Sequence, residues 1–297
     1  MKSNPEDALL ARLLPNLPGS PDLIVGPGDD CAAVRIPGAR DLLLLKTDCV
    51  AEDVHFLRSH DPARVGWKAL CRPLSDIAAM GGSPTHALVT IFSPPDLAPD
   101  YWTAFYRGLA KAARQFGVSI AGGELSRQPR GIAVSIALTG SVPKKQILLR
   151  SGGKPGDLLF VTGKLGSSLA GHHLDFIPRI PEARWLAAHV RPSAMMDLSD
   201  GLASDLPRLA RASGCGFVVN YETLPLRKGT QIANALSDGE DYELLFSIPP
   251  PLAEKLPALW KSQFPKVPLT QIGNLTISST PPDWPTGWDH FSEEENA

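Results

Sequence analysis

A short apolar run near the start of the chain, Leu42 to Leu45, is surrounded by acidic residues. The run is expected to form a short strand bounded by turn residues, with Thr47 and Asp48 at its end. Carboxylates brought together repel one another unless a cation neutralises them, and Mg2+ does this, usually alongside substrate phosphates. A single Asp here is most simply a solvated turn residue, but the clustering favours a metal site because similar Asp-bearing turns recur further along the chain. The five acidic residues on which this interpretation rests are Asp29, Asp30, Asp48, Glu52 and Asp53.

Composition excludes several classes of protein. The chain has 297 residues, 43% hydrophobic and 20% charged, which suits a soluble protein with two domains. A formal net charge of -2 gives no support to nucleic-acid binding. The four cysteines form no C-x-x-C pair, so reduced thiols in a cytoplasmic protein are expected rather than zinc or disulfides. We expect no membrane span and no signal peptide, because no apolar run is long enough and the N-terminus lacks an apolar core.

Helices and strands alternate in both halves of the chain, which predicts two layered α/β domains. Asp61 and Pro62 are expected to begin a helix that runs to Gly81, with a kink or interruption at Pro73. The boundary is predicted at Pro143, so that residues 1–143 form one domain and residues 144–297 the other. Expected helices are 5–14, 62–80, 99–116, 168–174 and 200–214, and expected strands are 86–92, 118–121, 132–142, 158–162, 217–220 and 242–248. The segment 281–297 is expected to be irregular, with its last residues disordered.

The tripeptide Leu-Ser-Asp occurs once in each half, ending at Asp76 and at Asp200. Ser and Asp commonly start helices, so capping is one interpretation of both copies. The first copy lies late in a helix that has already begun, so Asp76 is a poor helix cap there and a better candidate for an inward-facing ligand.

Other candidate residues have both a structural and a functional interpretation. Gly163 to Ser168 follows a predicted strand and opens a helix, but it does not match the P-loop pattern, and packing at a helix end suits its glycines better than phosphate binding. His55 beside the acidic stretch could bind an anionic substrate or be structural. Arg150 heads a glycine-rich loop and could hold phosphate or lie on the surface. No residue is assigned as a general base.

The order of motifs resembles that of the thiamine-monophosphate kinase family, within the superfamily of aminoimidazole-ribonucleotide synthetase and selenophosphate synthetase. The resemblance extends from about Gly26 to the terminal WDHF and implies a two-domain, non-P-loop fold. It also implies that a homodimer with ATP in a cleft phosphorylates thiamine monophosphate to thiamine diphosphate. The motifs that carry it are GPGDDCAAV, KTDCVAEDVHF, LSDIAAMGG, AGGELSR, RSGGKPGD, VTGKLGSSLAG, DLSDGLASDL and GEDYELLF.

The resemblance also implies roles for individual residues. Substrate contacts are expected from His55, Glu240 and Trp288. ATP contacts are expected from Gly123, Glu124, Arg150 and Ser199. The Mg2+ site is expected to comprise Asp30, Lys46, Thr47, Asp48, Asp76, Glu124, Asp197 and Asp200.

Three positions depart from the family pattern. Lys46 stands where a small residue is usual, Glu124 replaces an Asp, and Pro73 interrupts the usual run before Leu-Ser-Asp. None removes a carboxylate, so the sequence favours an active enzyme. Two alternatives stay open: a nucleotide-binding protein of the same fold that has lost catalysis, and another ATP-dependent enzyme of the superfamily.

Overall fold

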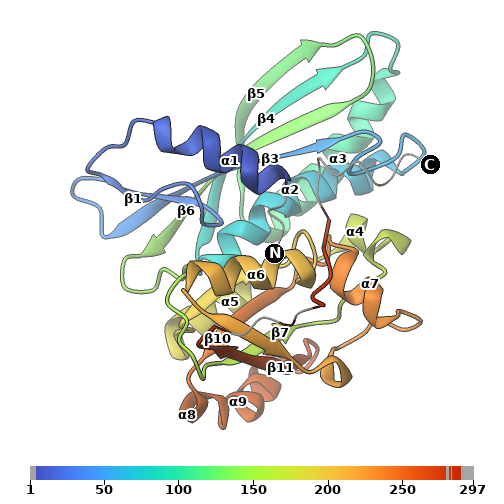
Figure 1. Ribbon diagram of the computed structural model, residues 1–297. Coiled ribbons are helices and arrows are strands. Elements are labelled where there is room, and N and C mark those ends of the chain that lie inside the picture. Colours follow the sequence, from blue (N-terminus) through green and yellow to red (C-terminus); the bar gives the residue numbers. More distant parts are fainter. Residues whose placement is uncertain (1–4, 279–280, 282, 289–297) are drawn as a thin grey trace.

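The molecule has two halves, and each half consists of a β-sheet with α-helices packed against it (Figure 1). The computed structural model describes residues 5–278, 281 and 283–288. Within these residues, no helix is long and apolar enough to cross a membrane. The elements are α1 (Pro5–Leu13), η1 (Leu14–Asn16), β1 (Leu23–Val25), β2 (Ala32–Arg35), β3 (Asp41–Ala51), α2 (Pro62–Ala79), β4 (Ser83–Ser93), α3 (Pro99–Phe116), β5 (Ser119–Arg127), β6 (Ala133–Pro143), β7 (Leu158–Thr162), η2 (Ser168–Ala170), α4 (His172–Asp175), α5 (Ile180–His189), β8 (Ala194–Asp197), α6 (Leu202–Ala212), β9 (Gly216–Val219), η3 (Tyr221–Thr223), α7 (Ile232–Ser237), β10 (Leu244–Ile248), α8 (Pro250–Ala253), α9 (Leu256–Gln263) and β11 (Leu269–Thr276).

The first half builds a six-stranded sheet in the order β1-β2-β3-β6-β4-β5, in which only β4 and β5 pair in parallel. Strand β3 is longer than predicted, because it pairs with β6 from Asp41 to Ala51 without a break. Thr47 and Asp48 therefore lie inside the strand rather than at its end. Side chains alternate between the two faces of a strand, so these two residues point to opposite sides of the sheet.

Helices α2 and α3 cover one face of this sheet. The predicted start of α2 is confirmed, since the Asp61 carboxylate accepts the Ala63 N–H at 2.9 Å. The two helices approach closely: a Cβ atom on Gly66 would lie 2.0 Å from the Phe105 carbonyl oxygen, and one on Gly108 would lie 1.7 Å from the Ala63 carbonyl oxygen. Pro73 does not interrupt α2, which is continuous from Pro62 to Ala79. The helix is buried along most of its length, and that packing outweighs one missing hydrogen bond.

The second half builds an antiparallel five-stranded sheet in the order β8-β10-β7-β11-β9. Both of its faces are covered. On β10, Phe246 belongs to one hydrophobic core and Leu245 to another. The first core continues across α2 into the first half, and the second lies under α6. Helix α2 also contacts α4, α5 and β8, so it lies between the two sheets, as Figure 1 shows.

Several local predictions are corrected. The strand expected over 118–121 is longer than predicted, because β5 continues through Gly122 and Gly123 to Arg127. The helix expected to run to Leu174 is instead the short turn η2 followed by α4. Helix α6 begins at Leu202, with Gly201 as its N-cap residue. Residues 284–288 form no helix or strand, as predicted, while the predicted disorder at the very end of the chain lies outside the described residues.

Candidate active site

Three buried aspartates from different parts of the chain meet between the two halves. Asp30 precedes β2, Asp76 lies within α2, and Asp197 ends β8. Carboxylate oxygens from all three lie within 4.8 Å of one another. Because α2 runs on to Ala79, Asp76 is not a helix cap, so the capping interpretation of the first Leu-Ser-Asp tripeptide is wrong.

The electrostatics of this cluster fit a divalent cation. Burial raises the pKa of Asp76 well above its ordinary range. Burial, followed by the charge of Asp30, raises the pKa of Asp197 to about 7. Within the described part of the chain, the buried Asp30 Oδ2 atom has no hydrogen-bond partner. Buried carboxylates that repel one another and leave an oxygen unsatisfied offer the hard oxygen ligands that Mg2+ prefers.

Lys46 brings a positive charge into the cluster. Its Nζ atom lies 2.6 Å from Asp76 Oδ1. Burial opposes its charge, but Asp76 and Asp48 outweigh that effect and raise the pKa of Lys46. A protonated ammonium has no lone pair to offer a metal, so the expectation that its side chain joins the ligand set is corrected. Lys46 instead neutralises part of the carboxylate charge.

Arg150 is positioned by the acidic turn before β2. Its Nη2 and Nε atoms donate to Asp30 Oδ1 at 2.5 and 3.0 Å, and its backbone N–H lies 3.3 Å from both carboxylate oxygens of Asp29. Burial, followed by the charge of Asp30, raises the pKa of Asp29 to about 6. Arg150 therefore belongs to the cluster rather than to an open surface.

Three other predicted metal residues lie around this cluster but outside it. The Thr47 side chain is on the opposite face of β3, where its hydroxyl lies 3.4 Å from that of Ser135, so side-chain coordination by Thr47 is not supported. Asp48 is on the inner face, 3.6 Å from Arg72. Asp200 forms an ion pair with Arg208.

Gly123 and Glu124 are not brought to the cluster within this chain. Strand β5 is the edge of its sheet, and Asp48 on β3 is aligned through Ile136 on β6 and Val89 on β4 with Gly123. Three strand spacings separate them, roughly 14 Å. Glu124 lies in the exposed edge strand β5, so the prediction that it joins Asp48 in one metal site is not met within this chain.

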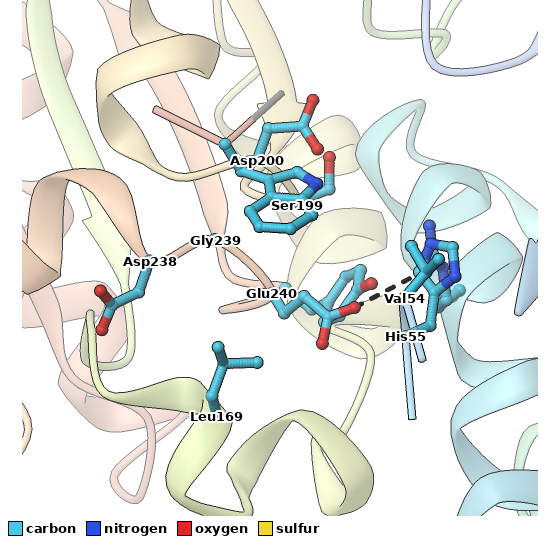
Figure 2. Close-up of a pocket in the computed structure, with 11 residues that line it drawn as sticks. Val54, His55, Leu169, Ser199, Asp200, Asp238, Gly239 and Glu240 are labelled. Carbon is cyan, nitrogen blue, oxygen red and sulfur yellow. Dashed lines mark ion pairs between the residues drawn. The ribbon is translucent and has the colours of Figure 1, made fainter. Parts of the chain in front are cut away.

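A pocket adjoins the cluster, and all three predicted substrate residues line it (Figure 2). Figure 2 shows Glu240 extending across the pocket toward the side on which His55 and Val54 lie. The lining combines carboxylates with apolar and aromatic groups and includes one arginine. It consists of Val54, His55, Arg72, Leu169, Ser199, Asp200, Asp238, Gly239, Glu240, Tyr242 and Trp288.

Glu240 is held rigidly by its backbone and by a buried lysine. Its φ of 54° is unusual for a residue other than glycine, and its N–H donates to the Ser199 carbonyl at 2.6 Å. Lys68 Nζ donates to Glu240 Oε2 at 2.5 Å and to the His55 carbonyl at 2.5 Å. Burial lowers the pKa of Lys68 to about 8, although Glu240 opposes that shift. Lys68 therefore ties two walls of the pocket together.

Sequence reasoning missed Lys68 and Arg72, although a signal was present. Lys68, Arg72 and Asp76 are spaced by four residues, which places all three on one face of α2. A charged stripe on a helix usually faces solvent. Here the same helix carries buried residues along most of its length, and that combination indicates an internal charged stripe.

Backbone donors in the loop after β7 are already paired. The Gly166 N–H lies 3.1 Å from both carboxylate oxygens of Asp241, and the Ser167 N–H donates to Asp238 at 2.7 Å. These contacts support a packing role for the loop. Near the end of the described chain, the Trp288 N–H donates to the Asp200 carbonyl at 3.1 Å, which holds this segment over the pocket.

Comparison with known proteins agrees with this arrangement. Residues 28–142 match the family model of the AIR synthase related protein N-terminal domain, and residues 154–276 match that of its C-terminal domain. Thiamine-monophosphate kinase from Rhodopirellula baltica is 38% identical over 288 residues, covering 91% of this chain and 89% of the relative. The protein of that name from Escherichia coli K12 is 33% identical, covering 97% and 98%.

Solved structures show the same relation and confirm the two-domain α/β fold. The structure described as AaThiL complexed with AMPPCP and TMP superposes with a TM-score of 0.76 at 32% identity, covering 96% of each chain. Thiamine monophosphate kinase from Aquifex aeolicus superposes with a TM-score of 0.71 at 31% identity, covering 93% of this chain and 94% of that one. With the fold, the carboxylate cluster and these relatives in agreement, the chain belongs to the thiamine-monophosphate kinase family.

Proposed function

We propose that this protein transfers the γ-phosphoryl group of ATP to thiamine monophosphate, giving thiamine diphosphate and ADP. The observation that carries the proposal is that two sites lie close together, linked by Arg72, which lines the pocket and lies 3.6 Å from Asp48. A buried carboxylate cluster suited to phosphate-bound cations adjoins a pocket suited to an aromatic cation. The family relation and the neighbour that binds AMPPCP and TMP support the same reaction.

The pocket chemistry matches thiamine. Thiamine has two aromatic rings, one of which carries a permanent positive charge. Tyr242 and Trp288 offer aromatic surface, and Asp200 and Glu240 offer negative charge. Rings of that kind bind well to apolar surfaces that carry a few placed polar groups. We therefore assign His55, Glu240 and Trp288 to substrate binding and Ser199 to the side of the pocket shared with ATP.

Asp30, Asp76 and Asp197 would hold Mg2+, with Asp48 and Asp200 placed to contribute from the edge of the cluster. Bound Mg2+ would neutralise the phosphates and lower the repulsion between donor and acceptor. Lys46 adds a fixed positive charge beside Asp76. Arg150 keeps Asp30 oriented through its two hydrogen bonds.

The protein's main task in such a reaction is to hold the acceptor oxygen in line with the γ-phosphoryl group. A phosphate monoester is already ionised near neutral pH, so its oxygen attacks without a general base. We therefore assign no base, and the proposed reaction is a direct transfer between substrates held at the two adjoining sites.

We also propose a homodimer formed through the first half of the chain. The sheet face opposite α2 and α3 carries exposed Leu45, Leu88 and Phe92, and β5 is an exposed edge. Apolar faces and open edges of this kind are normally covered. Gly123 and Glu124 would then reach an ATP site only across the dimer. In this division, residues 1–143 form the dimer and the main metal- and ATP-binding domain, while residues 144–297 form the second α/β domain and contribute Asp197 to the metal site.

Use of ATP and the four free cysteines, Cys31, Cys49, Cys71 and Cys215, support a cytoplasmic location.

One observation favours a second candidate, a nucleotide-binding protein that has lost catalysis. The Lys46 ammonium takes up space beside Asp76 and supplies a positive charge where a metal cation would otherwise bind. An ADP-coupled assay with ATP and Mg2+ separates the two functions. Thiamine monophosphate should stimulate ADP formation, whereas thiamine and an aminoimidazole precursor should not. ATP binding without substrate-dependent ADP would support the second candidate.

A further inference from the structure

Arg72 stands where the pocket meets the carboxylate cluster. Its Nη2 atom lies 3.6 Å from Asp48 Oδ1, and its Nη1 atom lies 3.7 Å from Glu240 Oε1. Both distances are too long for hydrogen bonds. The Arg72 side chain is only 12% exposed. The two carboxylates therefore attract its buried charge but accept no hydrogen bonds from it.

Two nitrogen donors of this guanidinium have no hydrogen-bond acceptor among the described residues. Across residues 5–278, 281 and 283–288, no hydrogen-bond partner lies within reach of the buried Arg72 Nε and Nη1 atoms. Buried side-chain donors nearly always have a partner, and an exception in a pocket wall indicates a ligand that supplies the acceptors. Lys68, one turn earlier on α2, does not share this property because Glu240 and the His55 carbonyl accept its hydrogen bonds.

The surrounding charge makes the required ligand an anion. Among the described residues that line the pocket, Arg72 is the only arginine or lysine, while Asp200, Asp238 and Glu240 are acidic. A substrate with a cationic ring and an anionic end would therefore have one place for its anionic end. That place is also the side of the pocket nearest Asp48 and the cluster, where the acceptor phosphate must lie for transfer.

We propose that Arg72 binds the phosphate group of the acceptor and so selects thiamine monophosphate over thiamine. This inference rests on the proposed function for the identity of the substrate. The planar guanidinium suits the purpose because it offers paired donors that match two phosphate oxygens, which an ammonium group does not. The same contact would hold the attacking oxygen beside the cluster, so Arg72 contributes to orientation as well as to affinity.

The test is calorimetric binding of thiamine monophosphate and of thiamine to the full chain, without ATP. Arg72→Gln should weaken thiamine monophosphate binding about 10- to 100-fold, the range for hydrogen bonds to a charged group. Thiamine binding should change less than about twofold. Arg72→Lys keeps the charge beside Asp48 and Glu240 and loses the fork, so it should fold like the wild type and recover only part of the loss.

Arg64→Gln is the matched control, since Arg64 lies on the same helix and pairs with Asp175 instead of lining the pocket. It should leave the affinities for both compounds unchanged. In steady-state kinetics, Arg72→Lys should raise KM for thiamine monophosphate more than KM for ATP, a split that general damage to the fold would not produce.

The outcomes separate this inference from the proposed function. Equal binding of both compounds by the wild type, or an unchanged ratio of affinities in Arg72→Gln and Arg72→Lys, overturns the role of Arg72. A wild type that prefers thiamine monophosphate but forms no ADP with it refutes the proposed reaction, and the role of Arg72 in phosphate binding stands.

Discussion

Replacing Lys46 by Met should destabilise the metal-free protein. Methionine keeps most of the side-chain length and removes the ammonium, which lies 2.6 Å from Asp76 Oδ1. The exposed fractions are 22% for the Lys46 side chain and 9% for that of Asp76, so water screens this pair only in part. Asp76 would then lie unpaired beside Asp30 and Asp197.

The expected loss follows from this geometry. Two unit charges at this separation attract by about 6 kcal/mol at an effective dielectric constant of about 20. Removing one partner of a buried pair costs about 3–5 kcal/mol, because the remaining charge stays buried. For a chain of this size, each 1 kcal/mol corresponds to roughly 2–4 °C, so the melting temperature should fall by about 6–20 °C.

Melting followed by tryptophan fluorescence, with EDTA and then with Mg2+, tests this. Mg2+ should raise the melting temperature of Lys46→Met more than that of the wild type, since a cation can take over the neutralising role of the ammonium. Lys261→Met, at an exposed position on α9, should behave as wild type in both conditions. If Lys46→Met melts at the wild-type temperature with EDTA, or gains no more from Mg2+, the charge-neutralising role is refuted.

Three further predictions concern Asp197, Glu124 and the oligomeric state. In EDTA, the folded protein holds a proton on Asp197 up to about pH 7, whereas the unfolded chain loses it near pH 4. This contribution to stability is present at low pH and lost as pH rises through 7, so Asp197→Asn should flatten the fall in melting temperature over pH 4–7. Glu124→Ala should lower Mg2+-dependent activity strongly, and Glu124→Asp should lower it less than roughly tenfold, about 1.4 kcal/mol of activation barrier. A wild-type rate in Glu124→Ala would show that Glu124 does not belong to the active site. Sedimentation at micromolar concentration should give a dimer mass, and an exposed-face variant, Leu88→Glu, should give the monomer.

Local patterns were sufficient for some elements of the fold and insufficient for others. Helix α3 was predicted with its observed bounds because its apolar spacing is regular and Gly117 ends it in a left-handed conformation. Strand β3 was predicted too short, because Lys46 and Asp48 break the apolar alternation on its inner face. Those polar residues belong to the site, so the pattern failed where the chain departs from ordinary core packing.

The candidate site was also predicted only in part from the sequence. The sequence pattern and resemblance singled out Asp30, Asp76 and Asp197, which the fold brings together from distant segments. Arg72 was not predicted as a site residue, because its burial depends on the tertiary packing of α2 between the two halves. Glu124 was expected beside the cluster, but the strand order of the sheet places it at an edge, and strand order cannot be read from a motif.

The central claim is that one phosphoryl group passes from ATP to thiamine monophosphate on this protein. A single-turnover reaction with ATP labelled in its γ-phosphate, Mg2+ and thiamine monophosphate tests it most directly, with products separated by chromatography. The account predicts that the label appears in thiamine diphosphate at the rate of ADP formation, and that thiamine gives no labelled product. Label released only as inorganic phosphate, or retained in ATP while both ligands are bound, would contradict the account.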